Sequence, residues 1–194
     1  MPQLGNPQAV AADTRDSVAR QRKRRSELVM LGEGLPINPA LPPIDFSVDF
    51  SPRHKQDVAL RALCVLMTAI KADRMHQTMV LRVVRQYGLA AHFSPCEKNF
   101  IRALDPSDAE RMQFSRRYES AWVLLWALGY VEKLESPGNR CNSDLAVEIM
   151  RDKTRQSFIV DARLRPLVLI LDQADLAYRY RCSLGDAGTE IQSP

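Results

Sequence analysis

The sequence is poor in the residues that most enzyme active sites and metal centres require. It holds 3 histidines and 4 cysteines among 194 residues. The cysteines form no C-x-x-C pair, and no histidine lies at metal-ligand spacing. The phosphate-binding, dinucleotide-binding, hydrolase and zinc-protease motifs are also missing. The sequence therefore predicts no metal and no cofactor, and it favours a protein without enzymatic activity.

Long apolar runs are lacking as well. The longest, residues 121–131, is about half of the length that spans a bilayer. The polar N-terminus has no apolar segment of the kind that a secretory signal contains. Together with the wide spacing of the cysteines, these features predict a cytoplasmic protein that does not contact a membrane.

Outside the N-terminal region, basic and acidic residues nearly balance, so an excess of one sign is lacking. The formal net charge is +4, and residues 1–27 contribute most of it, with six basic against three acidic residues. The basic run supplies the candidate nucleic-acid-binding residues Arg20, Arg22, Lys23, Arg24 and Arg25. A solvated face or an interaction arm is the favoured interpretation, because no aromatic side chains interleave with these cations to stack on bases.

Strand signals are scarce, whereas helix boundaries are marked repeatedly. The only short β-branched run is SFIV at residues 157–160, which is too little for a sheet. Ser94 with Glu97, and Ser107 with Glu110, form capping-box patterns at helix starts. These signals predict an all-α fold, a single globular helical domain of about six to seven helices with an irregular proline-rich strap.

The domain organisation follows from composition. A flexible tail is expected at each end, and the folded domain between them begins with a basic helix and a strap that contains four prolines. The predicted segments are a tail (1–12), one domain (13–182) that includes the basic helix (13–31) and the strap (35–50), and a second tail (183–194). Ser51 and Pro52 are expected to cap the next helix, which is apolar on nearly every side and is therefore expected at the centre of the domain.

The helix expected from Ser107 to Gly129 buries a stripe with two tryptophans and places Glu119 at its edge. In the favoured interpretation, Glu119 pairs with Arg116 or another arginine at the end of a core helix, because a buried carboxylate requires a partner. In the alternative, Arg116, Arg117 and Glu119 line a cleft for a polar or anionic ligand, since the guanidinium fork suits carboxylates and phosphates.

A polar stripe also follows the last helix, which is expected to start at Pro166. The predicted packing face comprises Leu167, Leu171, Ala174 and Tyr178. Asp172, Asp175 and Arg179 lie along a neighbouring edge, with Asp175 and Arg179 at the spacing of an i, i+4 ion pair. A solvated face is the favoured interpretation, and the alternative is that these residues meet Arg116 or Arg117 in the candidate ligand cleft.

Several segments resemble a known family. PINPALPPI (36–44), YGLAAHFSPCEKNFI (87–101), FSRRYESAWVLLWALGYVEKL (114–134) and LDQADLAYRYR (171–181) are similar, in order and spacing, to the bacterial family of domain of unknown function 4272. The resemblance implies an intracellular, mostly helical domain, and it assigns no activity. The family pattern continues beyond Tyr180 with a further helix, whereas here Arg181 and Cys182 follow and the chain soon stops.

Without that further helix, we expect an apolar surface to be left uncovered, which favours a homodimer or a protein partner that covers it. The leading functional hypothesis is therefore a non-enzymatic protein-interaction module. The alternative is a small enzyme or ligand-binding domain that uses the Arg/Glu/Asp cleft, and nucleic-acid binding through the basic arm is the least favoured function.

Overall fold

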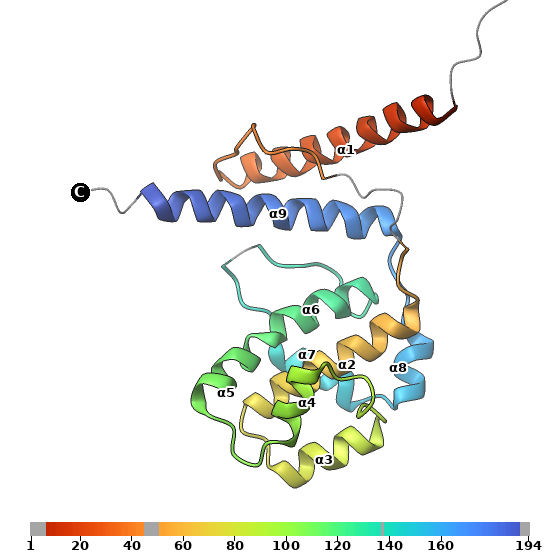
Figure 1. The fold of residues 1–194 in the computed structure, drawn as a ribbon, viewed down its shortest axis with the longest axis vertical. Helices are drawn as coiled ribbons and strands as arrows, with labels where there is room; N and C mark the ends of the chain where they lie inside the picture. Colours follow the sequence, from red (N-terminus) through yellow and green to blue (C-terminus); the bar gives the residue numbers. More distant parts are fainter. Residues whose placement is uncertain (1–6, 45–50, 137, 191–194) are drawn as a thin grey trace, which may run out of the picture. The chain divides into compact units, whose positions relative to one another are not determined.

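The computed structural model describes residues 7–44, 51–136 and 138–190, with side chains for residues 17–44, 51–136 and 138–183. The described residues form nine helices, α1 to α9, and no strand (Figure 1). The predicted all-α fold class is confirmed, and the number of helices is slightly higher than expected.

The chain divides into two compact units, and each is described by itself. The central unit comprises residues 53–165, and the terminal unit comprises residues 1–52 together with residues 166–194. The single domain predicted over residues 13–182 spans both units and stays a prediction.

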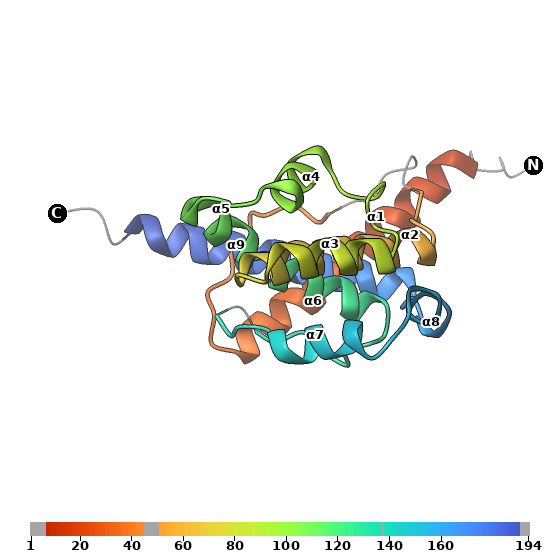
Figure 2. The ribbon, with the colours of Figure 1, turned by 90° about the horizontal axis from the view of Figure 1, so that it is seen from below.

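Helix α2 (Lys55–Ala72) is the core of the central unit. Every residue from Ala59 to Ala72 except Arg61 is buried, as predicted for a helix that is apolar on nearly all sides. Helix α2 packs against all the other helices of the unit, which are α3 (Gln77–Gln86), α4 (Pro95–Arg102), α5 (Asp108–Ser115), α6 (Arg117–Ala127), α7 (Ser143–Arg151) and α8 (Arg155–Asp161). Figure 2 shows this arrangement from a second direction.

The predicted start of α2 was wrong. Its N-cap is His54, which has an extended backbone and makes no side-chain capping bond, so Ser51 and Pro52 precede the helix. The helix begins at Lys55 in spite of the capping signal of Ser51, and this start places Asp57 in the first turn. A carboxylate there interacts favourably with the positive end of the helix dipole.

The helix predicted from Ser107 to Gly129 is interrupted at Arg116, so the expectation of one continuous helix was wrong. Helix α5 ends at Ser115, and Arg116 forms a turn with a φ of −63° and a ψ of −10° before α6 begins. The Ser115 hydroxyl donates to the Met112 carbonyl oxygen at 3.0 Å, and side-chain bonds of this kind often bend helices. The interruption lets α5 and α6 take different directions (Figure 1).

The predicted ends of this segment are confirmed. Ser107 and Glu110 form the capping box of α5. Gly129 follows α6 with a φ of +77°, and a Cβ there would lie 2.9 Å from the Arg163 carbonyl oxygen. The position therefore requires glycine both for its backbone conformation and for space.

Residues 157–160, the one strand-like run in the sequence, belong to helix α8. Thr154 and Ser157 form a capping box at its start, and Phe158 is buried. The cap explains why the β-branched residues are helical here, because the first turn is fixed by two reciprocal hydrogen bonds. The capping box predicted at Ser94 is confirmed for α4, and the Asn142 side chain caps α7 by accepting a hydrogen bond from the Leu145 N–H.

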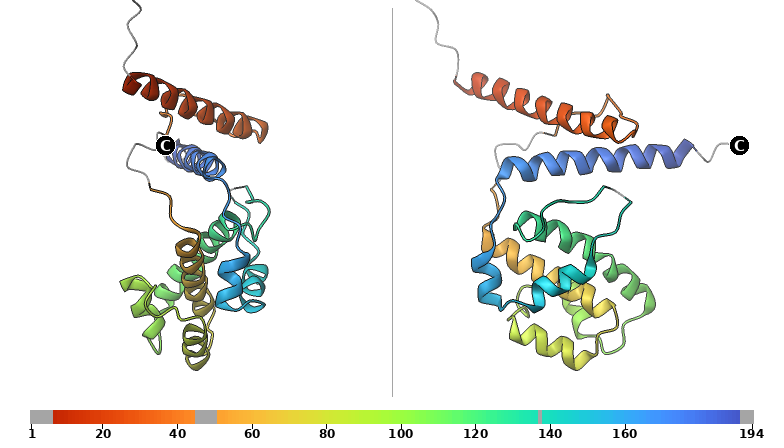
Figure 3. Two further views of the ribbon diagram at one scale, coloured as in Figure 1. Left: turned by 90° about the vertical axis from the view of Figure 1, so that its right-hand side faces the viewer. Right: turned by 180° about the vertical axis from the view of Figure 1, so that it is seen from behind.

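The terminal unit pairs α1 (Pro7–Gly32) with α9 (Leu167–Glu190), and the two helices lie side by side in Figure 3. Helix α1 includes the predicted basic helix and begins before it, so residues 7–12 of the predicted tail are helical, as are residues 183–190 at the other end. Residues 35–44 of the strap contain no helix. Residues 45–50 of the strap and residues 1–6 and 191–194 of the tails lie outside the described residues.

Candidate functional site

The residues of the predicted Arg/Glu/Asp cleft are distributed over both units. Arg116, Arg117 and Glu119 belong to the central unit, at the junction of α5 and α6. Asp172, Asp175 and Arg179 belong to α9 in the terminal unit. Each set is considered within its own unit, and a cleft that joins the two sets stays a prediction.

Glu119 has a different partner from the expected arginine. Its Oε1 accepts a hydrogen bond from the backbone N–H of Cys141 at 3.0 Å, which ties the first turn of α6 to the segment before α7. Burial, and then the neighbouring Glu119 carboxylate, raise the pKa of the Cys141 thiol to about 11. The thiol is therefore protonated at neutral pH and is a poor nucleophile.

The neighbours of Glu119 make separate local contacts. The Arg117 guanidinium lies over the Phe114 ring, with its central carbon 5.9 Å from the ring centroid. The Tyr118 hydroxyl donates to Asp73 Oδ2 at 2.6 Å, and burial together with this carboxylate raises the pKa of Tyr118. Arg116 is exposed at the helix junction. These contacts stabilise the α5–α6 junction against the end of α2.

Two of the three residues in the polar stripe of α9 are buried, so the prediction of a solvated face was wrong for Asp175 and Arg179. Asp175 and Arg179 are 0% and 2% exposed, and two hydrogen bonds of 2.8 and 3.0 Å join the guanidinium to the carboxylate. The predicted i, i+4 ion pair is confirmed. Ala174, expected on the packing face, is exposed, because the helix turns its charged stripe towards α1 and the strap.

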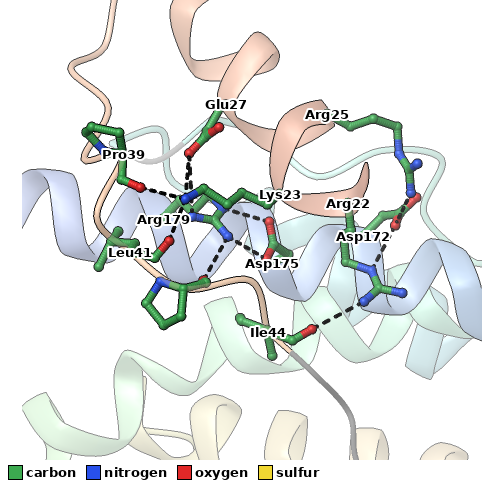
Figure 4. A network of polar contacts seen from close by, with 11 residues as sticks. Arg22, Lys23, Arg25, Glu27, Pro39, Leu41, Ile44, Asp172, Asp175 and Arg179 are labelled. Carbon is green, nitrogen blue, oxygen red and sulfur yellow. Dashed lines mark hydrogen bonds and ion pairs between the residues drawn. The ribbon is translucent and has the colours of Figure 1, made fainter. Parts of the chain in front are cut away.

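The strap explains why α9 buries charge. Proline has no N–H, so a proline-rich segment cannot satisfy its carbonyl groups by pairing with itself. Arg179 donates to the Pro42 carbonyl at 3.2 Å, and the Ser183 hydroxyl donates to the Pro36 carbonyl at 2.9 Å. Lys23 of α1 donates to the carbonyls of Pro39 and Leu41, both at 2.6 Å (Figure 4).

Members of the predicted nucleic-acid-binding run thus make contacts inside the terminal unit. Besides Lys23, Arg22 and Arg25 donate to the same oxygen of Asp172, at 3.1 and 2.7 Å (Figure 4). Arg22 is buried, whereas Arg20 and Arg24 are exposed. The basic run therefore links α1 to α9 and to the strap, and nucleic-acid binding through it stays a prediction.

The candidate functional site is a groove between α3 and α4 in the central unit, with a volume of about 390 Å³. Its floor is apolar, because the side chains of Val84, Phe93 and Ile101 are buried. Cationic side chains come from both helices, and the described lining residues include no acid. The lining comprises Leu81, Val84, Arg85, Ala90, Phe93, Lys98, Ile101 and Arg102. We call this feature the α3–α4 groove.

The chain positions the two walls of the groove through a tight loop. Gly88 ends α3 in the left-handed region with a φ of +62°, and the Ser94 capping box begins α4. From beneath, the buried Lys71 of α2 donates to the carbonyls of Ile101 and Ala103 at 2.9 and 2.6 Å. A cation at these carbonyls stabilises the negative end of the helix dipole, so α4 is held firmly against the core.

Comparison with known proteins identifies the family. Residues 22–194 match the model of the family described as Domain of unknown function (DUF4272). The chain belongs to the DUF4272 family. No curated protein and no solved structure matches the chain. The family resemblance seen in the sequence is thereby confirmed, and the DUF4272 match includes the α3–α4 groove and the contacts between α9 and the strap.

Further observations on the described part of the DUF4272 chain concern metal-binding groups, helix length and cysteines. No group of three or more His, Cys, Asp or Glu side chains in the described residues could hold a metal ion. Among the same residues, no helix has the length and apolar character needed to cross a membrane. Burial raises the pKa of the Cys64 thiol to about 12, so this cysteine, like Cys141, is protonated at neutral pH.

Sequence reasoning missed the cations of the DUF4272 groove. Arg85 belongs to α3, whereas Lys98 and Arg102 are one turn apart on α4. The capping box of α4 was evident from the sequence. The i, i+4 spacing of Lys98 and Arg102 was a usable signal for one basic wall, but the opposite wall depends on how the two helices pack.

Proposed function

We propose that this DUF4272 protein is a non-enzymatic protein-interaction module that binds an acidic amphipathic helix of a partner protein in the α3–α4 groove. The observation that carries the proposal is the combination of an apolar floor with a rim of three cations. An amphipathic helix that lays its apolar face into such a groove is a recurring mode of protein recognition.

The floor supports an apolar anchor. Leu81 is 39% exposed at the groove, and a partner side chain seated against it would remove both from water. Burying one leucine-sized side chain contributes about 1.5–3 kcal/mol, so two anchors at helical spacing supply useful affinity even for a short segment.

The rim supports the sign of the partner's charge. Arg85 stands on the α3 side, and Lys98 and Arg102 stand on the α4 side, with no acid among the described residues that line the groove. Carboxylates on the polar edges of a bound helix would lie near these cations. Such exposed pairs add modest affinity, but they increase the association rate and select against basic partners.

The protonated cysteines add support for a function without catalysis. Cys64 and Cys141 are held away from the thiolate form by burial, and the thiolate is the nucleophile in cysteine chemistry. Glu97, the buried carboxylate near the groove, has both oxygens bonded to Arg61. These groups stabilise the fold of the central unit and leave the groove as its interaction surface.

The proposal is tested with a labelled peptide that forms an amphipathic helix with leucines on one face and glutamates along its edges. We expect saturable binding by fluorescence anisotropy, weakened about tenfold or more by Leu81→Asp, because a charge in the groove opposes burial of the leucines. The matched control is Met79→Asp, since Met79 is equally exposed on α3 (42%) but does not line the groove. No binding by the native protein, or equal loss in both variants, would contradict the proposal.

A further inference from the structure

A second cavity of the central unit lies between the start of α2 and the side of α6, with a volume of about 370 Å³. Asp57, Val58, Leu60 and Arg61 line it from the first two turns of α2. Arg53 lines it from just before that helix, Leu124 from α6, and His92 from the loop between α3 and α4. We call this cavity the α2–α6 pocket. Its volume lies within the range of about 300–1,000 Å³ that is usual for small-molecule sites.

Arg61, which lines this pocket, is held rigidly. The Arg61 guanidinium donates from both Nη atoms to the Glu97 carboxylate, at 2.7 Å each, and Glu97 is 1% exposed. The backbone N–H of Ser94 donates to the same carboxylate at 3.0 Å. Arg61 nevertheless keeps 39% of its side chain exposed. Its remaining N–H groups are therefore preorganised donors at the edge of the pocket.

The pairing of Arg61 with Glu97 leaves a neighbouring carboxylate without its usual partner. Asp57 is one helical turn before Arg61, the spacing at which an ion pair normally forms. Because both Nη atoms of Arg61 bond to Glu97, Asp57 has no ion-pair partner among the described residues, and the same is true of Arg53. The pocket thus presents unpaired groups of both signs, a guanidinium from Arg53 and a carboxylate from Asp57.

An apolar surface completes the pocket. Val58 and Leu60 of α2 and Leu124 of α6 provide aliphatic side chains beside the charged groups. A purely inorganic anion would leave this surface in contact with water and would meet the Asp57 carboxylate. The complementary ligand therefore carries a negative group, a positive group and an aliphatic body.

We infer that the α2–α6 pocket binds a small zwitterion with an aliphatic side chain, of the chemical class of free apolar α-amino acids. The ligand carboxylate lies against Arg53 and the free N–H groups of Arg61, which match its geometry. The ligand ammonium lies against Asp57, and its aliphatic side chain packs on Val58, Leu60 and Leu124. This site is distinct from the α3–α4 groove and does not depend on the proposed protein-interaction function.

Titration of the isotope-labelled full chain with L-leucine, followed by amide chemical shifts in NMR spectra, tests the inference. We expect saturable shifts centred on Asp57, Val58, Arg61 and Leu124, with a dissociation constant at or below the millimolar range. Two analogues separate the charges, because leucinamide lacks the carboxylate and 4-methylpentanoate lacks the ammonium. Each is expected to bind about tenfold or more weakly than leucine.

Matched variants complete the experiment. Arg53→Gln and Asp57→Asn, both at exposed positions, are expected to weaken leucine binding about tenfold, whereas Arg82→Gln, on the exposed side of α3, leaves it unchanged. The inference is overturned if leucine causes no saturable shifts, or if 4-methylpentanoate binds as tightly as leucine. Peptide binding in the α3–α4 groove is expected to be unaffected by Arg53→Gln, so the two functions succeed or fail separately.

Discussion

Glu97 shows how one buried charge is made compatible with an apolar core. Burial alone would raise the pKa of its carboxyl group, but the hydrogen bonds from Arg61 and Ser94 outweigh that effect, and the pKa is lowered from its ordinary value. Glu97 also completes the capping box that begins α4. The same side chain therefore fixes one wall of the α3–α4 groove and orients Arg61 at the α2–α6 pocket.

This pairing predicts how stability depends on pH. Because the pKa of Glu97 is lower in the folded protein than in the unfolded chain, its contribution is complete above the unfolded value of about 4.3 and is lost as the pH falls through the folded value. In Arg61→Met the carboxyl group keeps its burial but loses its partner, so its folded pKa rises above the unfolded value. The free energy of unfolding of this variant should therefore increase as the pH is lowered from 7 to 5.

Urea unfolding at both pH values measures this effect. At pH 7 we expect the free energy of unfolding of Arg61→Met to be about 2–3 kcal/mol lower than that of the native protein. Breaking a fully buried pair costs about 3–5 kcal/mol, and the loss is smaller here because water reaches the exposed side of Arg61. The double variant Arg61→Met with Glu97→Leu should recover most of the loss, since it leaves no unpaired charge. A single variant that keeps the native pH dependence would contradict the assigned role of the pair.

The Glu97 interaction could be predicted only in part. The sequence correctly indicated that Ser94 and Glu97 form a capping box, which is a local pattern. It gave no sign that Glu97 is buried or that it pairs with Arg61, because those two residues are separated by 36 positions and meet only when α2 and α4 pack. The partner of Glu119 was missed for the same reason, since Cys141 follows it by 22 positions.

Among the helices, α9 differs most from what its periodicity indicates. The apolar residues of its first turns predicted a packing face, yet Asp175 and Arg179 are buried against α1 and the strap. Apolar periodicity assumes that a packing face excludes charge. The assumption fails here because the neighbouring strap presents proline-flanked carbonyls that require donors, and Arg179 supplies them while Asp175 balances its charge.

Removing the guanidinium should therefore loosen the terminal unit. Arg179→Met leaves the fully buried Asp175 without its partner, which costs about 3–5 kcal/mol in comparable buried pairs. The matched control is Arg181→Met on the same helix, where the side chain is exposed and the expected change is within about 0.5 kcal/mol. Hydrogen exchange of the α1 and α9 amides measures the difference, and equal exchange in the two variants would contradict the role of the pair.

Helix boundaries were predicted better than helix continuity. The caps at Ser94 and Ser107 and the glycine after α6 are short-range signals, and the structure confirms them. The break at Arg116 has no comparable signal. It accompanies the side-chain bond of Ser115 to Met112 and the stacking of Phe114 on Phe100 of α4, whose ring centroids are 4.0 Å apart.

For the whole molecule, the sequence predicted the fold class and the family, and both are confirmed. The near-neutral charge beyond residue 27 concealed the basic rim of the α3–α4 groove, because net charge says nothing about where charges gather. The basic run that dominates the sequence instead holds the terminal unit together through Arg22, Lys23 and Arg25. The most conspicuous cations therefore support the structure, and less conspicuous ones form the candidate site.

A charge-reversal experiment tests the proposed groove most directly. Two peptides share the same leucines and differ only in having glutamates or lysines along the helix edges. We expect the native protein to bind the acidic peptide about tenfold or more tightly than the basic one, and Arg85→Glu with Lys98→Glu to reverse this preference. Arg82→Glu, on α3 but outside the lining, should leave it unchanged. If the double variant still prefers the acidic peptide, the α3–α4 groove is not the docking surface.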